Sequence, residues 1–109
     1  MKELIAGLSK QIREAIEIGR AAKFKATNRE IKSIIVCGLG GSGIGGKIIS
    51  LLLIDELKVP FLTTNDYTIP ACVNENTLVI ASSYSGNTEE TIYAVREAEK
   101  RNAEIAVIT

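Results

Sequence analysis

The stretch Ser33-Ile34-Ile35-Val36-Cys37, followed at once by Gly38-Leu39-Gly40-Gly41-Ser42-Gly43, decides the fold of this chain. A short run that is apolar on both faces is typical of a strand in a parallel sheet covered by helices on both sides. Glycines directly after such a strand allow a tight turn into a helix. We therefore expect a strand at 33–37, a glycine loop, and a helix at 44–57. Apolar residues run almost all round this helix, which favours a buried position.

The rest of the chain alternates in the same way. Residues 3 to about 23 carry apolar side chains at three- and four-residue intervals, which is typical of an amphipathic helix. A further helix is expected at 87–101, with Ile92, Val95 and Ala98 on its inner face. The remaining strands are expected at 59–64, 77–82 and 104–109. Strands alternating with helices imply an α/β fold with a doubly wound parallel sheet, for which we expect the flavodoxin-like strand order 2-1-3-4.

A second loop, Ser83-Tyr84-Ser85-Gly86-Asn87-Thr88, lies between the strand at 77–82 and the helix that follows it. In the order 2-1-3-4 the strand order reverses between the first and third strands, which is where such sheets bind ligands. Both loops then present backbone N–H groups and the positive ends of helices to one place. Capping of the helix needs only one polar group, from Asn87 or Ser85. The other hydroxyls of the loop are then available to a ligand. The pattern predicts a site for a phosphorylated ligand.

Two nucleotide-binding patterns fit the first loop less well. Gly38, Gly40 and Gly43 match G-x-G-x-x-G, but the acidic residue near the end of the next strand, Asp66, lies too far past Gly38 and beyond Thr63-Thr64-Asn65. The run 41–47 matches the start of a Walker loop, yet Ile48 stands where Ser or Thr must hold Mg²⁺. Neither pattern accounts for the hydroxyls of the second loop.

Composition narrows the function classes. Thirteen basic and thirteen acidic residues cancel among 109, so neither nucleic acid nor an anionic membrane is an expected partner. Two separate cysteines form no ligand-spaced pair, and Cys37 is expected to be a buried, unreactive thiol in a cytoplasmic protein. The chain has no histidine, the usual acid or base near neutral pH. No metal or other cofactor is expected.

The segment 83–91 resembles the signature of the SIS (sugar isomerase) domain, and together with 38–46 it resembles the N-terminal part of bifunctional phosphoglucose/phosphomannose isomerases. The resemblance implies that residues 1–109 form a single, incomplete SIS domain. It also implies a sugar-phosphate site, with the glycine-serine turn near the sugar and the second loop around the phosphate. The binding residues implied are Gly40, Gly41, Ser42, Ser83, Ser85, Gly86, Asn87 and Thr88.

The same resemblance implies a reaction, the interconversion of glucose 6-phosphate or mannose 6-phosphate with fructose 6-phosphate, in a homodimer without metal or nucleotide. The catalytic glutamate and histidine of the family lie downstream of this region, so the 109 residues are expected to bind without turnover. An SIS module that senses a sugar phosphate without catalysis is the alternative. With the downstream part of the domain missing, Ile105, Val107 and Ile108 are expected to be incompletely covered.

Overall fold

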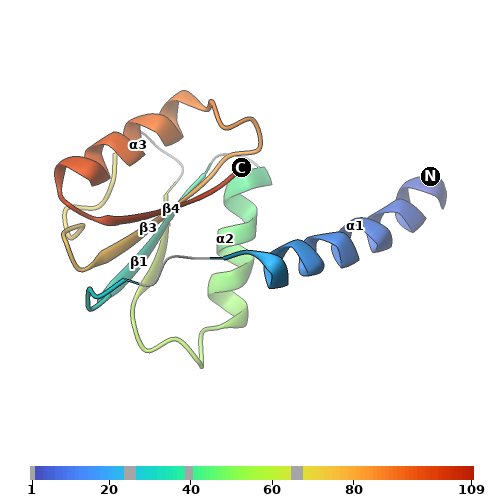
Figure 1. The fold of residues 1–109 in the computed structure, drawn as a ribbon, viewed down its shortest axis with the longest axis horizontal. Coiled ribbons are helices and arrows are strands. Elements are labelled where there is room, and N and C mark those ends of the chain that lie inside the picture. The colour runs from blue at the N-terminus through green and yellow to red at the C-terminus, as the bar shows by residue number, and fades with distance from the viewer. Residues whose placement is uncertain (1, 24–26, 39–40, 65–67) are drawn as a thin grey trace.

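The computed structural model describes residues 2–23, 27–38, 41–64 and 68–109. Within these residues three helices and four strands follow one another along the chain (Figure 1). They are α1 (Lys2–Ala21), β1 (Ser33–Cys37), α2 (Gly41–Leu52), β2 (Phe61–Thr64), β3 (Thr77–Ser82), α3 (Glu89–Lys100) and β4 (Glu104–Ile108).

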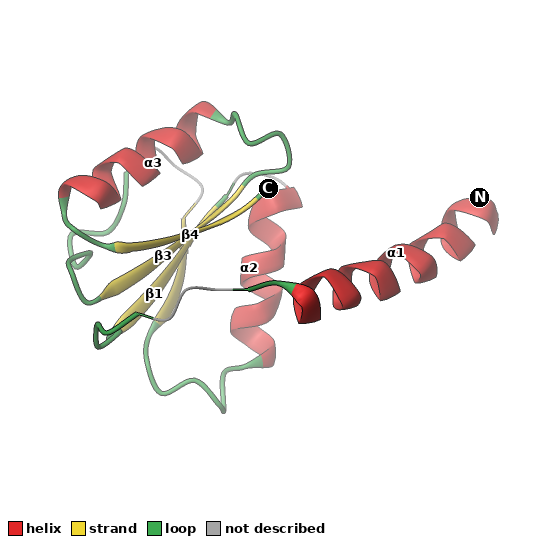
Figure 2. Ribbon diagram, in the orientation of Figure 1, coloured by secondary structure: helices red, strands yellow, loops and turns green. Residues whose placement is uncertain are grey.

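The strands form one parallel sheet in the order β2-β1-β3-β4. This confirms the α/β class and the predicted order. Ile35 pairs with Val79, which pairs with Ile105, so these residues form one row across the sheet. Helix α3 lies on one side of the sheet and α2 on the other, as Figure 2 shows. The predicted strands at 33–37 and 77–82 have the observed bounds.

Helix α2 differs from its prediction. It begins at Gly41 and ends at Leu52, instead of spanning 44–57, and residues 53–56 form a turn closed by a hydrogen bond from Leu57 N to Leu53 O (2.9 Å). The prediction of a buried helix is wrong, because most of its isoleucine and leucine side chains are exposed. The sheet meets α2 at Gly46, where a Cβ would lie 2.8 Å from Val36 Cγ1. One sheet can cover only one side of a helix, so the apolar residues on its other sides remain open.

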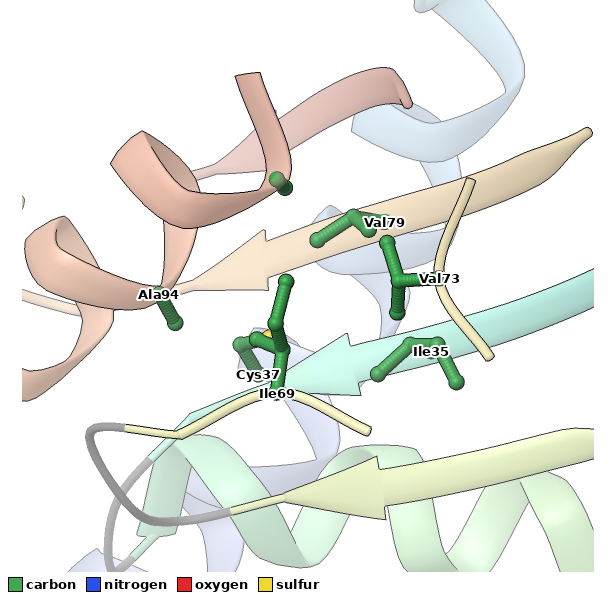
Figure 3. Packing of buried hydrophobic residues seen from close by; sticks show 7 residues of the cluster. Ile35, Cys37, Ile69, Val73, Val79 and Ala94 are labelled. Atoms are coloured by element: carbon green, nitrogen blue, oxygen red, sulfur yellow. The ribbon is translucent and has the colours of Figure 1, made fainter. Parts of the chain in front are cut away.

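The core lies between the sheet and α3. Ile35, Cys37 and Val79 point to this side and are covered by Ala94 and Ala98 of α3. In Figure 3, Ile69 and Val73, from the connection between β2 and β3, lie beside the strand residues. The buried residues of α3 are Thr91, Ala94 and Ala98. The expected inward positions of Ile92 and Val95 are therefore half-buried flanks, because small alanines bring the helix close to the strands.

Helix α1 extends away from the body of the molecule (Figure 1). Its side chains from Leu8 to Ala21 are all exposed, including the apolar residues Leu8, Ile12 and Ile16. The predicted amphipathic helix is confirmed as a helix, but its apolar side has no covering element in the described part of the chain. No helix in the described residues is both long enough and apolar enough to cross a membrane.

Candidate functional site

The two loops singled out in the sequence lie at the same edge of the sheet. β1 and β3 are adjacent and parallel, and Cys37, the last residue of β1, pairs with Ala81 near the end of β3. β1 leads into α2 and β3 leads into α3, so both helices start at the carboxyl edge (Figure 2). From these two strands the chain proceeds in opposite directions, to β2 and to β4. This is the position at which open α/β sheets bind ligands.

Hydroxyl groups organise the loop after β3. The Ser83 side chain is buried, and its Oγ lies 2.9 Å from Thr88 Oγ1. Ser83 Oγ also accepts a hydrogen bond from Gly86 N (3.1 Å). Asn87 N donates to Ser85 Oγ (3.2 Å), and Ser85 is exposed. The loop therefore combines a half-buried hydroxyl pair with one hydroxyl open to solvent.

Gly86 makes this turn possible. Its φ of 70° lies in the left-handed region, which residues with a Cβ rarely adopt. A Cβ at Gly86 would also lie 2.8 Å from Thr109 Oγ1. Ser83 N donates to Ile108 O (3.0 Å), so the loop is joined to the end of β4 as well as to β3.

The start of α3 has no side-chain cap. Its N-cap residue is Thr88, whose side chain makes no capping hydrogen bond, so the prediction of Asn87 or Ser85 as the cap is wrong. The reason is the Ser83–Thr88 pair, which holds Thr88 Oγ1 at the other side of the turn. The first N–H groups of a helix have no acceptor within the helix. Thr88 supplies no side-chain acceptor for them, and the acidic residues Glu89 and Glu90 lie in the first turn.

The first loop is described in part. Gly40 lies outside the described residues, as does the side chain of Ser42, whereas Gly41 is the first residue of α2. A Cβ at Gly43 would lie 2.7 Å from Gly38 O, so a glycine is needed where α2 starts against the end of β1. The binding roles of Gly40, Gly41 and Ser42 stay predictions.

A pocket of about 290 Å³ adjoins the second loop, between α3 and β4. Ser83, Gly86 and Thr88 form one end of its lining, and Val107 lies on the β4 side. Arg96 and Glu99 add one cationic and one anionic side chain, and the sequence reasoning identified neither; the position of Arg96 is the one that bears on an anion. Arg96 lies four residues after Ile92, which lines the same pocket, so helical spacing could have placed Arg96 beside it.

Cys37 is not available for chemistry at this edge. It is almost fully buried, and burial raises the pKa of its thiol to about 11. The thiol is therefore neutral near pH 7, as expected from its place in an apolar strand. The chain has no histidine either, so neither an imidazole nor this thiol offers an acid–base group at this edge.

Comparison with known sequences identifies the family. The SIS domain profile matches residues 28–109. The chain belongs to the SIS domain family. Two relatives are bifunctional phosphoglucose/phosphomannose isomerases. The protein of Caldicellulosiruptor bescii is 43% identical over the whole chain, which matches the N-terminal part of that enzyme and 32% of its length. The protein of Thermoplasma volcanium is 47% identical over 70% of the chain and 24% of its own length.

The fold agrees with this SIS assignment. A crystal structure named as a phosphosugar isomerase, from Salmonella typhimurium LT2, superposes with a TM-score of 0.64 and 28% identity. The match covers 72% of this chain and 25% of that protein. The chain thus spans about a third or less of the length of these relatives. Residues of α1 precede the part that matches the SIS profile.

Proposed function

We propose that this SIS domain binds the phosphate group of a six-carbon sugar phosphate, as the N-terminal part of a glucose 6-phosphate/mannose 6-phosphate isomerase. The observation that carries the proposal is the loop of residues 83–88 at the uncapped start of α3. The names of the isomerase relatives supply the substrate class. A cytoplasmic location and a homodimer belong to the same proposal.

Each hydroxyl of the loop has a distinct part in holding the phosphate. Ser83 and Thr88 share one hydrogen bond, and the pair has two hydroxyl hydrogens, so one hydrogen remains for a ligand. Ser85 is exposed and can donate directly. Gly86 permits the turn, and Asn87 N holds Ser85 Oγ in place. Gly40, Gly41 and Ser42 would contact the sugar from the neighbouring loop.

Catalysis needs groups outside these residues. Moving a proton between C1 and C2 of the sugar requires a base, and opening of the ring requires an acid. The family resemblance assigns these roles to a glutamate and a histidine downstream, and this chain has no histidine. We expect the 109 residues alone to bind substrate without isomerising it, with no metal or other cofactor.

A second candidate is an SIS module that senses a sugar phosphate and catalyses nothing, because the hydroxyl loop of residues 83–88 would serve binding in either case. A chimera separates the two. Residues 1–109 would replace the matching N-terminal part of the Caldicellulosiruptor bescii relative. Isomerisation of glucose 6-phosphate by the chimera supports the enzyme, whereas a folded chimera that binds glucose 6-phosphate but has no activity supports the sensor.

Calorimetric titration of the chain with glucose 6-phosphate tests the phosphate site. We expect Ser85→Ala to weaken binding by about 1.5–3 kcal/mol, because a hydrogen bond to a charged group is lost. Ser9→Ala, on the exposed side of α1, is the matched control and should leave binding unchanged. Titration with glucose, which lacks the phosphate, should give no binding heat. The proposal fails if Ser83→Ala, Ser85→Ala and Thr88→Ala all bind as the original chain does.

A further inference from the structure

The phosphate loop, residues 83–88, is held against the end of β4 at two points. At its start, Ser83 N donates to Ile108 O (3.0 Å). At its turn, the Thr109 side chain lies beside Gly86, since a Cβ at Gly86 would lie 2.8 Å from Thr109 Oγ1. β3 and β4 are parallel neighbours, so both strands end at the same edge of the sheet (Figure 2). The end of β4 therefore borders the candidate site.

The hydroxyl group of Thr109 makes the close contact with the turn. The position of a Cβ on Gly86 lies 3.9 Å from Thr109 Cβ, an ordinary van der Waals distance, but only 2.8 Å from Thr109 Oγ1. Threonine branches at Cβ, which restricts rotation of its side chain about χ1. The hydroxyl therefore has few alternative positions beside Gly86. Thr109 is exposed, so replacing it removes no buried contact of the core.

Gly86 needs neighbours to keep its conformation. Its φ is 70°, and glycine adopts positive and negative φ about equally readily, so the residue itself does not select this turn. Its N–H is directed to Ser83 Oγ (3.1 Å) and to Ser83 O (3.3 Å). The side of its Cα on which a Cβ would stand faces Thr109. Ser83 and Thr109 are thus the two contacts that favour the left-handed turn.

We propose that Thr109 is a positioning residue for the phosphate loop, whose hydroxyl keeps Gly86 in the turn that orients the hydroxyls of this loop. The inference rests on the proposed function, because it concerns the loop that would hold the phosphate. Gly86 N donates to Ser83 Oγ, and Asn87 N, the next donor, to Ser85 Oγ (3.2 Å). If the turn at Gly86 loosened, both hydroxyls would lose their fixed directions.

Hydrogen exchange, measured by NMR on the ligand-free chain, tests the positioning without any ligand. We expect exchange of the Gly86 N–H to accelerate at least about fivefold in Thr109→Ala, because a turn that opens more often exposes its amide to water. Thr109→Ser keeps the hydroxyl and should keep the original rate. Exchange at Val79, in the buried centre of the sheet, should be unchanged, which excludes a general loss of stability. An unchanged rate at Gly86 in Thr109→Ala overturns the proposal.

Calorimetric titration with glucose 6-phosphate tests the consequence for binding. We expect Thr109→Ala to weaken binding by about five- to tenfold, since the ligand must then order a turn that was ordered before. Thr109→Ser should bind as the original chain does. Thr27→Ala is the matched control, because Thr27 is exposed and its hydroxyl accepts a hydrogen bond from Arg29 N instead of adjoining the loop. A Thr109→Ser chain that binds as weakly as Thr109→Ala contradicts the role of the hydroxyl.

A second substitution at Gly86 should reverse the sign of the effect. In Gly86→Ala the new methyl group meets the Thr109 hydroxyl, and Thr109→Ala in the same chain removes that clash and leaves a contact of 3.9 Å. We therefore expect Thr109→Ala to weaken binding in the original chain and to strengthen it in Gly86→Ala. Equal effects in the two backgrounds overturn the proposal. Circular dichroism verifies folding, and the single Thr109 variants decide alone if Gly86→Ala does not fold.

Failure of the proposed function has a different signature. If the original chain gives no binding heat with glucose 6-phosphate, the proposed function fails, and exchange at Gly86 still decides whether Thr109 holds the turn. If the original chain and Thr109→Ala bind equally well, the proposed function stands and the role of Thr109 is wrong.

Discussion

The two faces of the sheet are covered in opposite ways. On the α3 side, Ile35, Cys37 and Val79 are almost completely buried under the alanines of the helix. On the α2 side, the helix approaches β1 through Gly46, and its large apolar residues, such as Leu52, are exposed. Both faces are apolar in sequence, so composition does not separate them.

The difference follows from the residues that surround the small side chains in each helix. In α3 the small residues Ala94 and Ala98 lie in a helix rich in charged residues, so burying them leaves a largely charged outer surface. In α2 the small residues are glycines in a helix that is otherwise apolar, so burying them leaves isoleucines and leucines outside. The buried cluster among the described residues therefore lies on the α3 side, whereas the α2 side leaves large apolar side chains exposed.

Among the substitutions, truncating a residue at the centre of the α3 side of the sheet should have the largest effect on stability. We expect Ile35→Ala to lower the free energy of unfolding by about 2–5 kcal/mol, because it removes buried carbon and leaves a cavity. Ile35 is fully buried, whereas Leu52 is 71% exposed. Leu52→Ala, the control, should change it by less than about 0.5 kcal/mol. Urea unfolding measures both, and equal losses would show that the two faces contribute alike.

Alkaline pH should lower the free energy of unfolding through Cys37, which is buried on the α3 side of the sheet. The pKa of the thiol is 9.0 in the unfolded chain and about 11 when the side chain is buried. Between these values the unfolded chain loses this proton and the folded chain keeps it, so stability falls as pH rises. The free energy of unfolding therefore falls from pH 9 upwards on account of Cys37, and the total loss above pH 11 is about 2–3 kcal/mol.

Comparison with Cys37→Ala isolates the effect of this thiol from that of the other ionisable groups of the chain. We expect the stability of the original chain to fall more steeply than that of the variant between pH 9 and 11. Cys72→Ala, at an exposed position, should follow the original chain. Parallel curves for all three proteins would contradict the assignment.

The sequence predicted the strands and their order because parallel strands buried on both faces have a simple signature. The runs at 33–37 and 77–82 are apolar, short and followed by loops that cannot continue a strand. Helix α2 was harder, since a helix made mainly of glycine, isoleucine and leucine is compatible with either a buried or an exposed position. Its burial depends on how much of the sheet lies under it, which is a property of the tertiary structure.

The sequence was enough to locate the candidate site, but it did not predict which side chains form hydrogen bonds with each other there. Hydroxyls after a buried strand and before a helix indicated the edge at which Ser83, Ser85 and Thr88 lie. The pairing of Ser83 with Thr88 depends on the left-handed turn at Gly86, and so does the choice of Thr88 as N-cap. Local preferences rank capping residues, but the turn decides which side chain faces which atom.

Two neighbouring glycines of α2 should respond in opposite directions to the same substitution. Gly46→Ala places a Cβ 2.8 Å from Val36 Cγ1, and we expect it to destabilise the chain by about 1–3 kcal/mol. A Cβ at Gly45 would have nothing within 4 Å, so Gly45→Ala should stabilise the chain by about 0.5–1 kcal/mol through helix propensity. Thermal unfolding of the pair measures where α2 meets the sheet. If Gly45→Ala destabilised the chain, α2 would contact the sheet through Gly45 rather than through Gly46, and the assignment of the contact would be wrong.

The smallest expected effect on stability concerns an ion pair at the edge of the sheet, where the segment after α1 meets the start of β4. Arg29 donates to Asn102 O and pairs with Glu104 at 3.3 Å, which joins the segment after α1 to the start of β4. Both side chains are partly exposed, so Arg29→Gln should cost only about 0.5–1 kcal/mol, less at high salt. Lys10→Gln breaks a more exposed pair with Glu14 and should cost nothing measurable. Urea unfolding at low and high salt measures both. If Arg29→Gln destabilised the chain as much as Ile35→Ala, this edge would hold the fold together as firmly as the core, and the contrast between the two faces would fail.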